Sequence, residues 1–215
     1  MGIKTLFRNI WRRISFPGSG EYWEQNYAGG GTSGEGSYGI LARFKADFLN
    51  KFVSEEHIET LIEFGCGDGN QLAMASYPRY IGVDVSRSAV QMCARKFLDD
   101  PSKTFLTLAG YNGERAECAL SLDVIYHLVE DPVFHEYMNR LFAAADRFVI
   151  VFSTNHDESY GPGVHVRHRR FTEWVSQNAK PWRLLEQVAN PHKPAGADAD
   201  RESSSPADFY IFRRD

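Results

Sequence analysis

The sequence predicts an α/β fold, in which helices cover both faces of a mostly parallel sheet. From residue 60 onward, short apolar segments alternate with amphipathic helical segments, and this alternation is typical of parallel strands joined by helices. A glycine-rich turn at 65–69, GCGDG, follows the first apolar segment, and Asp84 closes the second. The chain of 215 residues is 43% hydrophobic, which is enough for one sizeable core.

The expected strands are short apolar runs bounded by glycine, proline or polar residues. The first covers 60–64 and leads into the glycine turn. Six more are expected at about 80–84, 104–108, 117–122, 147–152, 182–188 and 207–213. The last two, joined by a Pro-, Ala- and Ser-rich segment at 190–206, predict an antiparallel hairpin.

The expected helices lie between these strands, at about 70–76, 87–98 and 132–145, and from the expected N-cap Thr172 to about 179. Ahead of the first strand, Ser37 is the expected N-cap of a helix that carries Ile40, Phe44, Phe48 and Phe52 at successive i+4 steps. The connection at 109–116 is too short for a crossover helix. We therefore expect one face of the sheet to be thinly covered there.

The N-terminal part contains two further features. Residues 3–14 predict a basic amphipathic helix, which can lie on an anionic membrane or pack on the protein or on a second copy of it. The glycine-rich loop at 29–36, flanked by Tyr22, Trp23 and Tyr27, predicts a lid over a ligand. A linker whose aromatic side chains fill the core is the alternative.

The net charge, the cysteines and the apolar runs indicate which partners and which cellular compartment to expect. The formal net charge of -4 gives no general reason to expect a nucleic-acid partner. Cys66, Cys93 and Cys118 show no C-x-x-C spacing, which fits a reducing compartment and argues against disulfides or a zinc site. No apolar run is long enough to cross a bilayer, and we see no signal peptide. We expect a cytoplasmic protein, with membrane contact at the inner face only through 3–14.

The glycine turn and Asp84 together predict a nucleoside ligand. At the end of the second strand, Asp84 can accept hydrogen bonds from both hydroxyls of a ribose. A dinucleotide fingerprint requires glycine where Asn70 stands, and Glu63 would repel a pyrophosphate but suits a cationic ligand. NAD is therefore disfavoured.

From Tyr22 onward the chain resembles the small bacterial class I S-adenosylmethionine (SAM)-dependent methyltransferases. The resemblance rests on the Tyr-Trp-Glu opening, the SGEGSYG loop at 33–39, motif I at 63–69, motif II ending at Asp84 and motif IV at 119–128. It implies a Rossmann-like fold with a seven-stranded sheet, SAM as the methyl donor and S-adenosylhomocysteine (SAH) as the product. It does not imply the acceptor. The acid that usually follows the third strand is missing at 109–112, so adenine must be contacted in another way.

With this resemblance we expect three regions: a basic N-terminal segment at 1–20, a lid and helix at 21–56, and the SAM-binding domain at 57–215. Lys45 is expected to pair with the carboxylate of the cofactor. Asp123 also suits a turn. The full set of expected cofactor-binding residues is Glu63, Gly65, Cys66, Gly67, Asp84, Val85, Asp123, Tyr38 and Lys45.

The expected catalytic residues are His127, as a general base at the end of the fourth strand, and Tyr126, which can flank the methyl group. A structural histidine is an equal alternative. The expected acceptor-binding residues are His165, Arg167, His168, Arg169 and Arg170. Arginine forks match carboxylates or phosphates, which favours an anionic acceptor, although a solvated charged face is an alternative. No metal site is expected.

The sequence therefore predicts an enzyme that transfers methyl groups from SAM to a small or lipid-linked acceptor, including an anionic one. The alternative is a SAM-binding scaffold protein that keeps the fold without turnover.

Overall fold

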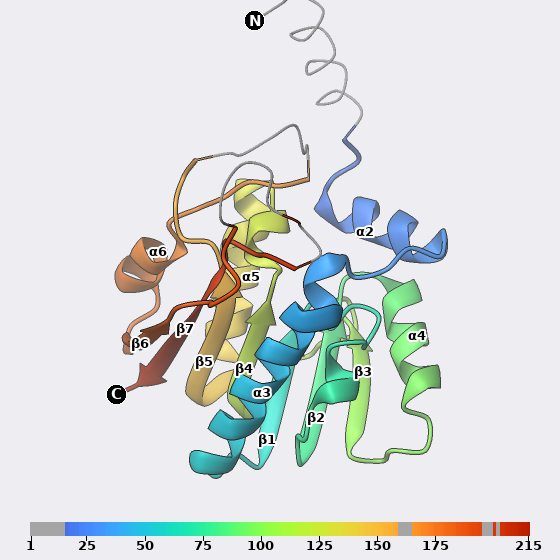
Figure 1. Cartoon of the computed structure of the whole chain (residues 1–215), viewed down its shortest axis with the longest axis horizontal. Helices are drawn as coiled ribbons and strands as arrows, with labels where there is room; N and C mark the ends of the chain where they lie inside the picture. Colours follow the sequence, from blue (N-terminus) through green and yellow to red (C-terminus); the bar gives the residue numbers. More distant parts are fainter. Residues whose placement is uncertain (1–15, 159–164, 195–199, 201–202) are drawn as a thin grey trace, which may run out of the picture.

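The computed structural model describes residues 16–158, 165–194, 200 and 203–215, so the predicted helix at 3–14 lies outside the described residues. One seven-stranded sheet runs through the molecule in the order β3-β2-β1-β4-β5-β7-β6 (Figure 1). Strands β1 to β5 pair in parallel, and β7 pairs antiparallel with both β5 and β6. The predicted mostly parallel sheet with an antiparallel C-terminal hairpin is confirmed.

All seven strands lie within two residues of their predicted positions. They are β1 (Thr60–Phe64), β2 (Arg79–Asp84), β3 (Lys103–Thr107), β4 (Ala116–Leu122), β5 (Ala145–Ser153), β6 (Trp182–Val188) and β7 (Asp208–Arg214). The α-helices are α2 (Ser19–Ala28), α3 (Gly39–Glu55), α4 (Arg87–Lys96), α5 (Asp131–Ala143) and α6 (Phe171–Asn178). Short 3-10 turns occur at η1 (Glu35–Ser37), η2 (Leu72–Met74) and η3 (Ile125–His127). No helix among the described residues is long and apolar enough to cross a membrane.

The prediction of a helix at 70–76 is wrong, since only the single turn η2 forms there. Tertiary hydrogen bonds hold this segment instead: Asn70 Nδ2 donates to Ser37 O at 2.7 Å and Gln71 Nε2 donates to Ala42 O at 3.0 Å. Pro78 comes directly before β2 and cannot donate a helical hydrogen bond. The segment therefore packs against α3 as a turn.

Two predicted helix caps are also wrong. The N-cap of α3 is Tyr38, one residue after Ser37, and it makes no side-chain capping bond. The N-cap of α6 is Arg170, and Thr172 lies inside the helix. The hydroxyl of Thr172 instead exchanges hydrogen bonds with the amide side chain of Asn155. For Thr172, this contact with a distant segment overrides the local capping preference.

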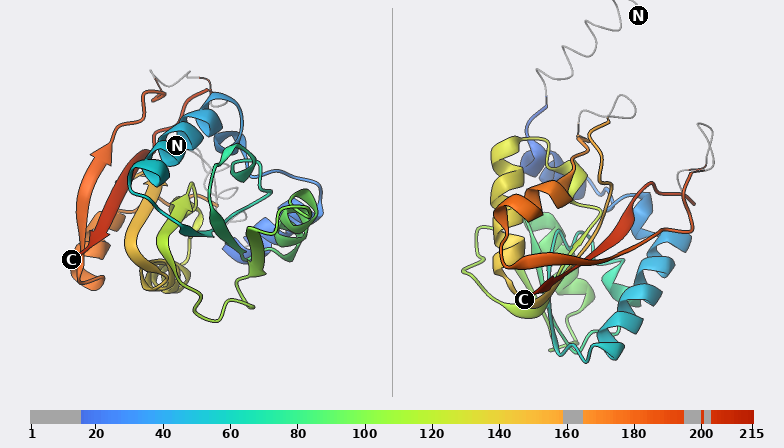
Figure 2. Two further views of the ribbon diagram at one scale, coloured as in Figure 1. Left: turned by 90° about the horizontal axis from the view of Figure 1, so that it is seen from below. Right: turned by 90° about the vertical axis from the view of Figure 1, so that its left-hand side faces the viewer.

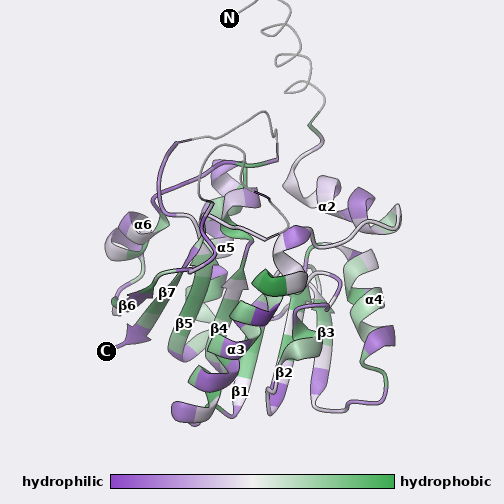
Figure 3. Cartoon of the chain, in the orientation of Figure 1, coloured by the Kyte–Doolittle hydropathy of each residue, from purple (hydrophilic) through white to green (hydrophobic). Residues whose placement is uncertain are grey.

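The sheet lies between two layers of helices, with α3 and α4 on one face and α5 and α6 on the other (Figure 2). The strands are predominantly hydrophobic, and polar residues are concentrated on the outer surfaces of the helices (Figure 3). On α3 the phenylalanines pack at the edge of the core, whereas Ile40 is 46% exposed. A charged residue, Lys45, occupies the buried face of this helix with only 1% exposure. Burying a lysine is costly unless it is paired, so this position points to a functional site.

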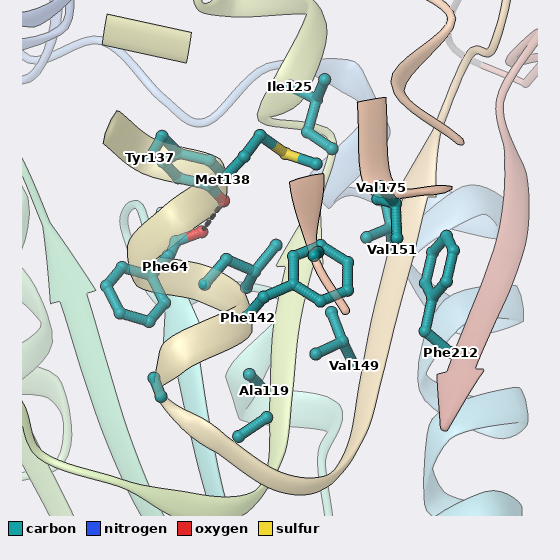
Figure 4. Packing of buried hydrophobic residues seen from close by; sticks show 14 of the residues in the cluster. Phe64, Ala119, Ile125, Tyr137, Met138, Phe142, Val149, Val151, Val175 and Phe212 are labelled. Carbon is teal, nitrogen blue, oxygen red and sulfur yellow. Dashed lines mark hydrogen bonds between the residues drawn. The ribbon is translucent and has the colours of Figure 1, made fainter. Parts of the chain in front are cut away.

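The expected lack of a crossover helix is confirmed: the described residues 108–115 join β3 to β4 without a helix. The ring of Tyr111 instead packs edge-on against Phe64, with centroids 5.2 Å apart. On the neighbouring part of this face, α5 packs on β1 and β4 (Figure 4). The Tyr137 hydroxyl donates to Phe64 O at 2.9 Å and also bonds Ser121 Oγ at 2.7 Å. These bonds fix the end of β1, from which the glycine turn begins.

Candidate active site

A cavity of about 150 Å³ lies at the carboxyl ends of β1, β2 and β4. Helix α2 lies at this end of the sheet (Figure 1), and its residues Ser19, Gly20 and Trp23 line the cavity. Seven of the nine expected cofactor residues also line it, namely Lys45, Glu63, Gly65, Cys66, Asp84, Val85 and Asp123. The structure thus brings together side chains from the segment before β1 and from three strand ends.

The glycine turn takes a backbone shape that other residues rarely adopt. Gly65, Gly67 and Gly69 have φ values of 86°, 57° and 70°, in the left-handed region. A Cβ atom on Gly67 would lie 2.2 Å from Ser33 Oγ. The turn therefore needs glycine both for its conformation and for the close approach of the preceding loop. Gly67 is not among the residues that line the cavity.

Asp84 is buried directly beside this turn. Its Oδ2 accepts from the backbone N–H of Gly67 at 2.9 Å, and its Oδ1 accepts from the N–H of Ser86 at 2.9 Å. Burial raises the pKa of the carboxyl to about 6. Each carboxylate oxygen has a further lone-pair site, so Asp84 can still accept hydrogen bonds from a ligand.

Glu63, at the end of β1, is a second buried acid. Its Oε2 accepts from the Tyr80 hydroxyl at 2.6 Å. Burial raises the pKa of this carboxyl to about 7, although the Tyr80 hydrogen bond and the charge of Lys45 oppose the rise. No salt bridge to Glu63 forms within the described part of the chain. A cationic ligand would therefore stabilise its charged form.

Lys45 and Asp123 form a buried ion pair, with 2.5 Å between Nζ and Oδ2. Asp123 has the left-handed φ of 60° just after β4, and the Tyr126 hydroxyl donates to its Oδ1 at 2.8 Å. A Cβ on Gly36 would lie 2.9 Å from Asp123 Oδ2. The lysine expected to be available for a ligand carboxylate is thus already paired with a protein acid, and both partners line the cavity.

The segment from α2 to the glycine-rich loop is tied down at three places. Ser19 bonds Glu130 through its N–H at 2.8 Å and its hydroxyl at 2.5 Å. Glu24 accepts from the hydroxyls of Ser86 and Ser88 at 2.7 and 2.8 Å, at the start of α4. These contacts hold α2 over the cavity, in the position that a lid would occupy.

The third attachment joins the glycine-rich loop to the glycine turn. The N–H of Ser33 donates to Asp68 Oδ2 at 2.9 Å, and the N–H of Asp68 donates to Ser33 Oγ at 2.9 Å. The Tyr38 hydroxyl also donates to Asp68 Oδ2, at 2.8 Å. Tyr38 does not line the cavity. In this structure Tyr38 anchors the loop through Asp68, and its expected contact with the cofactor stays a prediction.

His127 lines the cavity from the turn after β4. Its Nδ1 is 3.1 Å from the carbonyl oxygen of His165. Because a carbonyl only accepts, Nδ1 carries the hydrogen, and Nε2 of the neutral ring keeps its lone pair. Burial lowers the pKa of His127 to about 4. The Trp23 ring packs edge-on against the imidazole, with 4.9 Å between centroids.

Comparison with known families matches this chain to a methyltransferase domain over residues 39–192, more than half of its length. The chain belongs to the class I SAM-dependent methyltransferases. Solved methyltransferase structures share its fold. N-methyltransferase NodS from Bradyrhizobium japonicum WM9, in complex with SAH, superimposes with a TM-score of 0.68 at 13% identity over 91% of this chain and 98% of that one. No curated protein matches significantly.

Two further structures illustrate the breadth of the fold. Magnesium protoporphyrin IX methyltransferase (ChlM) from Synechocystis PCC 6803, with bound SAM, gives a TM-score of 0.59 at 15% identity over 96% of this chain and 97% of that one. A SAM-dependent methyltransferase from Clostridium acetobutylicum ATCC 824 gives 0.55 at 11% identity over 79% and 90%. These likenesses establish the fold of this methyltransferase and leave its acceptor open.

The residues expected to bind an anionic acceptor have other partners in this methyltransferase. Arg167 and Arg169 both pair with Asp131 Oδ1, at 3.0 and 2.7 Å. Both also donate to the carbonyl of Val129, each at 3.0 Å. Arg170 pairs with Asp157 at 3.0 Å and is largely exposed. None of these arginines lines the cavity. Arg167 and Arg169 hold the segment before α5 in place, and binding of an anionic acceptor by the three arginines stays a prediction.

The remaining expected residues lie around His127. The His165 ring stacks between those of His127 and Tyr22, with centroids 5.5 and 4.6 Å away. His168 Nδ1 is hydrogen-bonded to the Thr154 hydroxyl at 2.7 Å. Tyr126 contacts Asp123 and does not line the cavity. The described residues hold no group of three or more potential metal ligands.

Several cavity residues were not singled out from the sequence, and two of them bear on the proposals below. Leu108 directly follows β3, and its position beside a strand end is the signal that could have identified it. Gln71 lies in the segment predicted as a helix. Because its role depends on a contact with α3, no local pattern marks it.

Proposed function

We propose that this methyltransferase methylates a small uncharged acceptor that reaches the cavity between His127 and Trp23. The observation that carries the proposal is His127, a buried neutral imidazole that lines the same cavity as the two buried acids Glu63 and Asp84. In the reaction, the acceptor lone pair attacks the methyl carbon, the carbon–sulfur bond breaks, and sulfur keeps its electron pair. The acceptor proton leaves toward His127 Nε2 or solvent.

In the proposed cofactor seat, Asp84 binds the ribose hydroxyls and the turn formed by Gly65, Cys66 and Gly67 approaches the ligand with its backbone. Val85 and Leu108 line the same cavity directly after β2 and β3. Their apolar side chains are suited to flank adenine where the usual acid is missing.

The methionine part of SAM carries a carboxylate and an ammonium group. We propose that Lys45 binds the carboxylate and Asp123 the ammonium, so that the cofactor inserts into the present ion pair. Each side chain then exchanges one opposite charge for another, which avoids an unpaired buried charge. The segment 21–56 serves in this proposal as the lid and the helix that supply Trp23 and Lys45.

The charges around the cavity support a neutral acceptor over an anionic one. Among the described lining residues the cations are Lys45 and Arg140. Lys45 is paired with Asp123, and Arg140 is paired with Glu136. An anionic acceptor would therefore find lining acids and no unpaired cation in the described part of the cavity. An uncharged amine fits best, because its lone pair attacks without prior loss of a proton and His127 is only a weak base.

The test uses SAM labelled in its methyl group and matched acceptors of one size that carry an amine, a hydroxyl or a carboxylate. The proposal expects transfer to the amine first. His127→Ala should lower kcat while the Kd for SAH is unchanged. If turnover remains intact, His127 is structural. Cofactor binding with no product across the panel would instead support the scaffold alternative.

A further inference from the structure

Gln71 is a buried side chain whose amide oxygen has no protein partner in the described part of the chain. The residue is only 9% exposed and lines the cavity beside Lys45 and Glu63. Its Nε2 donates to the carbonyl oxygen of Ala42 at 3.0 Å. Its Oε1 is buried and forms no hydrogen bond with the described residues. An unpaired buried acceptor is destabilising, so a ligand that donates here gains affinity.

The Ala42 contact decides which end of the amide is available. A backbone carbonyl can only accept a hydrogen bond, so the amide nitrogen must face Ala42 and the oxygen must be the other end. Ala42 and Lys45 are three residues apart on α3 and lie on the same face of this helix. Gln71 is thereby held next to the Lys45–Asp123 pair, at the part of the cavity assigned above to the methionine moiety.

Of the two charged groups of the methionine moiety, only the ammonium can donate a hydrogen bond to the Gln71 oxygen. An ammonium group has three N–H donors and needs several acceptors, whereas a carboxylate would be repelled by an amide oxygen. Asp123, Glu63 and Gln71 line the cavity and offer oxygen atoms from three separate elements. We propose that Gln71 Oε1 accepts a hydrogen bond from the α-ammonium of SAM and thereby positions the methionine moiety. This inference rests on the cofactor seat proposed above.

The test compares Gln71→Leu with the unchanged protein by calorimetry, using three probes. SAH carries the ammonium, its deamino analogue keeps only the carboxylate, and 5′-methylthioadenosine lacks both groups. The Kd for SAH should rise about tenfold or more, as expected for a lost hydrogen bond to a charged group. The Kd values for the other two probes should stay within about twofold.

Gln91→Leu is the matched control, because Gln91 is exposed on α4 and does not line the cavity. If Gln71→Leu does not fold, Gln71→Met replaces it, since methionine keeps the unbranched shape and lacks the oxygen. An unchanged Kd for SAH, or an equal loss for all three probes, overturns the inference. Failure of the unchanged protein to bind any of the three probes would instead count against the proposed cofactor seat.

Discussion

Replacing Asp84 tests the proposed cofactor-binding site most directly, because each of its carboxylate oxygens accepts a backbone hydrogen bond that fixes the orientation of the carboxylate. One accepts from the N–H of Gly67 and the other from the N–H of Ser86, each at 2.9 Å. An asparagine has a single carbonyl oxygen, so Asp84→Asn can satisfy one of these N–H groups and must turn its own NH₂ toward the other. The variant therefore loses at least one of the two ribose acceptors and loosens the glycine turn.

The expected magnitude follows from the two proposed ribose contacts. Hydrogen bonds to a charged group contribute about 1.5–3 kcal/mol each. Losing at least one of them gives about 1.5 kcal/mol at the lower end, which corresponds to a roughly tenfold or greater rise in the Kd for SAH. Burial raises the Asp84 pKa to about 6, so the carboxylate is mostly ionised at neutral pH. The full effect should be visible under ordinary buffer conditions.

Calorimetry with SAH, adenosine and 2′-deoxyadenosine measures this loss. The unchanged protein should prefer adenosine over its deoxy form, and Asp84→Asn should reduce that preference. Asp99→Asn is the control, because Asp99 is exposed and does not line the cavity. A folded Asp84→Asn protein that binds SAH as tightly as the unchanged protein would refute the assignment.

Two further predictions concern a buried acid and the N-terminus. Because the Glu63 pKa rises from its ordinary 4.5 to about 7, the free protein should lose about 3 kcal/mol of stability as pH rises through this window. SAH affinity should increase over the same window, as the ionised carboxylate meets the ammonium. Melting and calorimetry should show both trends flattened in Glu63→Gln, and unchanged profiles would contradict this role. For residues 3–14, sedimentation with anionic vesicles should be stronger for the full chain than for a chain starting at Gly20, at about 1 kcal/mol per basic residue; equal sedimentation of the two rules out the membrane contact.

The strands and the glycine turn were predictable because they depend on neighbours in the chain. An apolar run followed by G-x-G forms a strand and a left-handed turn in many contexts, and β1 begins and ends at the predicted residues. The prediction of a helix at 70–76 failed because two side-chain hydrogen bonds hold this segment as a turn. Their partners lie 33 and 29 positions away in the sequence. Such partners leave no local pattern.

The arginines show the same limit for function. Three arginines within four residues suggested an anion site, since the sequence does not reveal which acids lie nearby. In the structure Asp131 forms ion pairs with Arg167 and Arg169. Asp157 forms an ion pair with Arg170. The sequence could not show that protein acids lie within reach of these guanidinium groups, and binding of an anionic acceptor by them stays a prediction.

By itself, the sequence of this methyltransferase determined the glycine turn, the acid at the end of β2 and hence the class of cofactor, because these features lie within single strand-turn units. Only the tertiary structure decided that Lys45 pairs with Asp123, 78 residues away, and that the Gln71 amide oxygen at the cavity has no hydrogen-bond partner among the residues that the structure describes. The physical reason is that a buried charge or amide takes its partner from whichever element the fold packs against it. Sequence spacing does not specify that element.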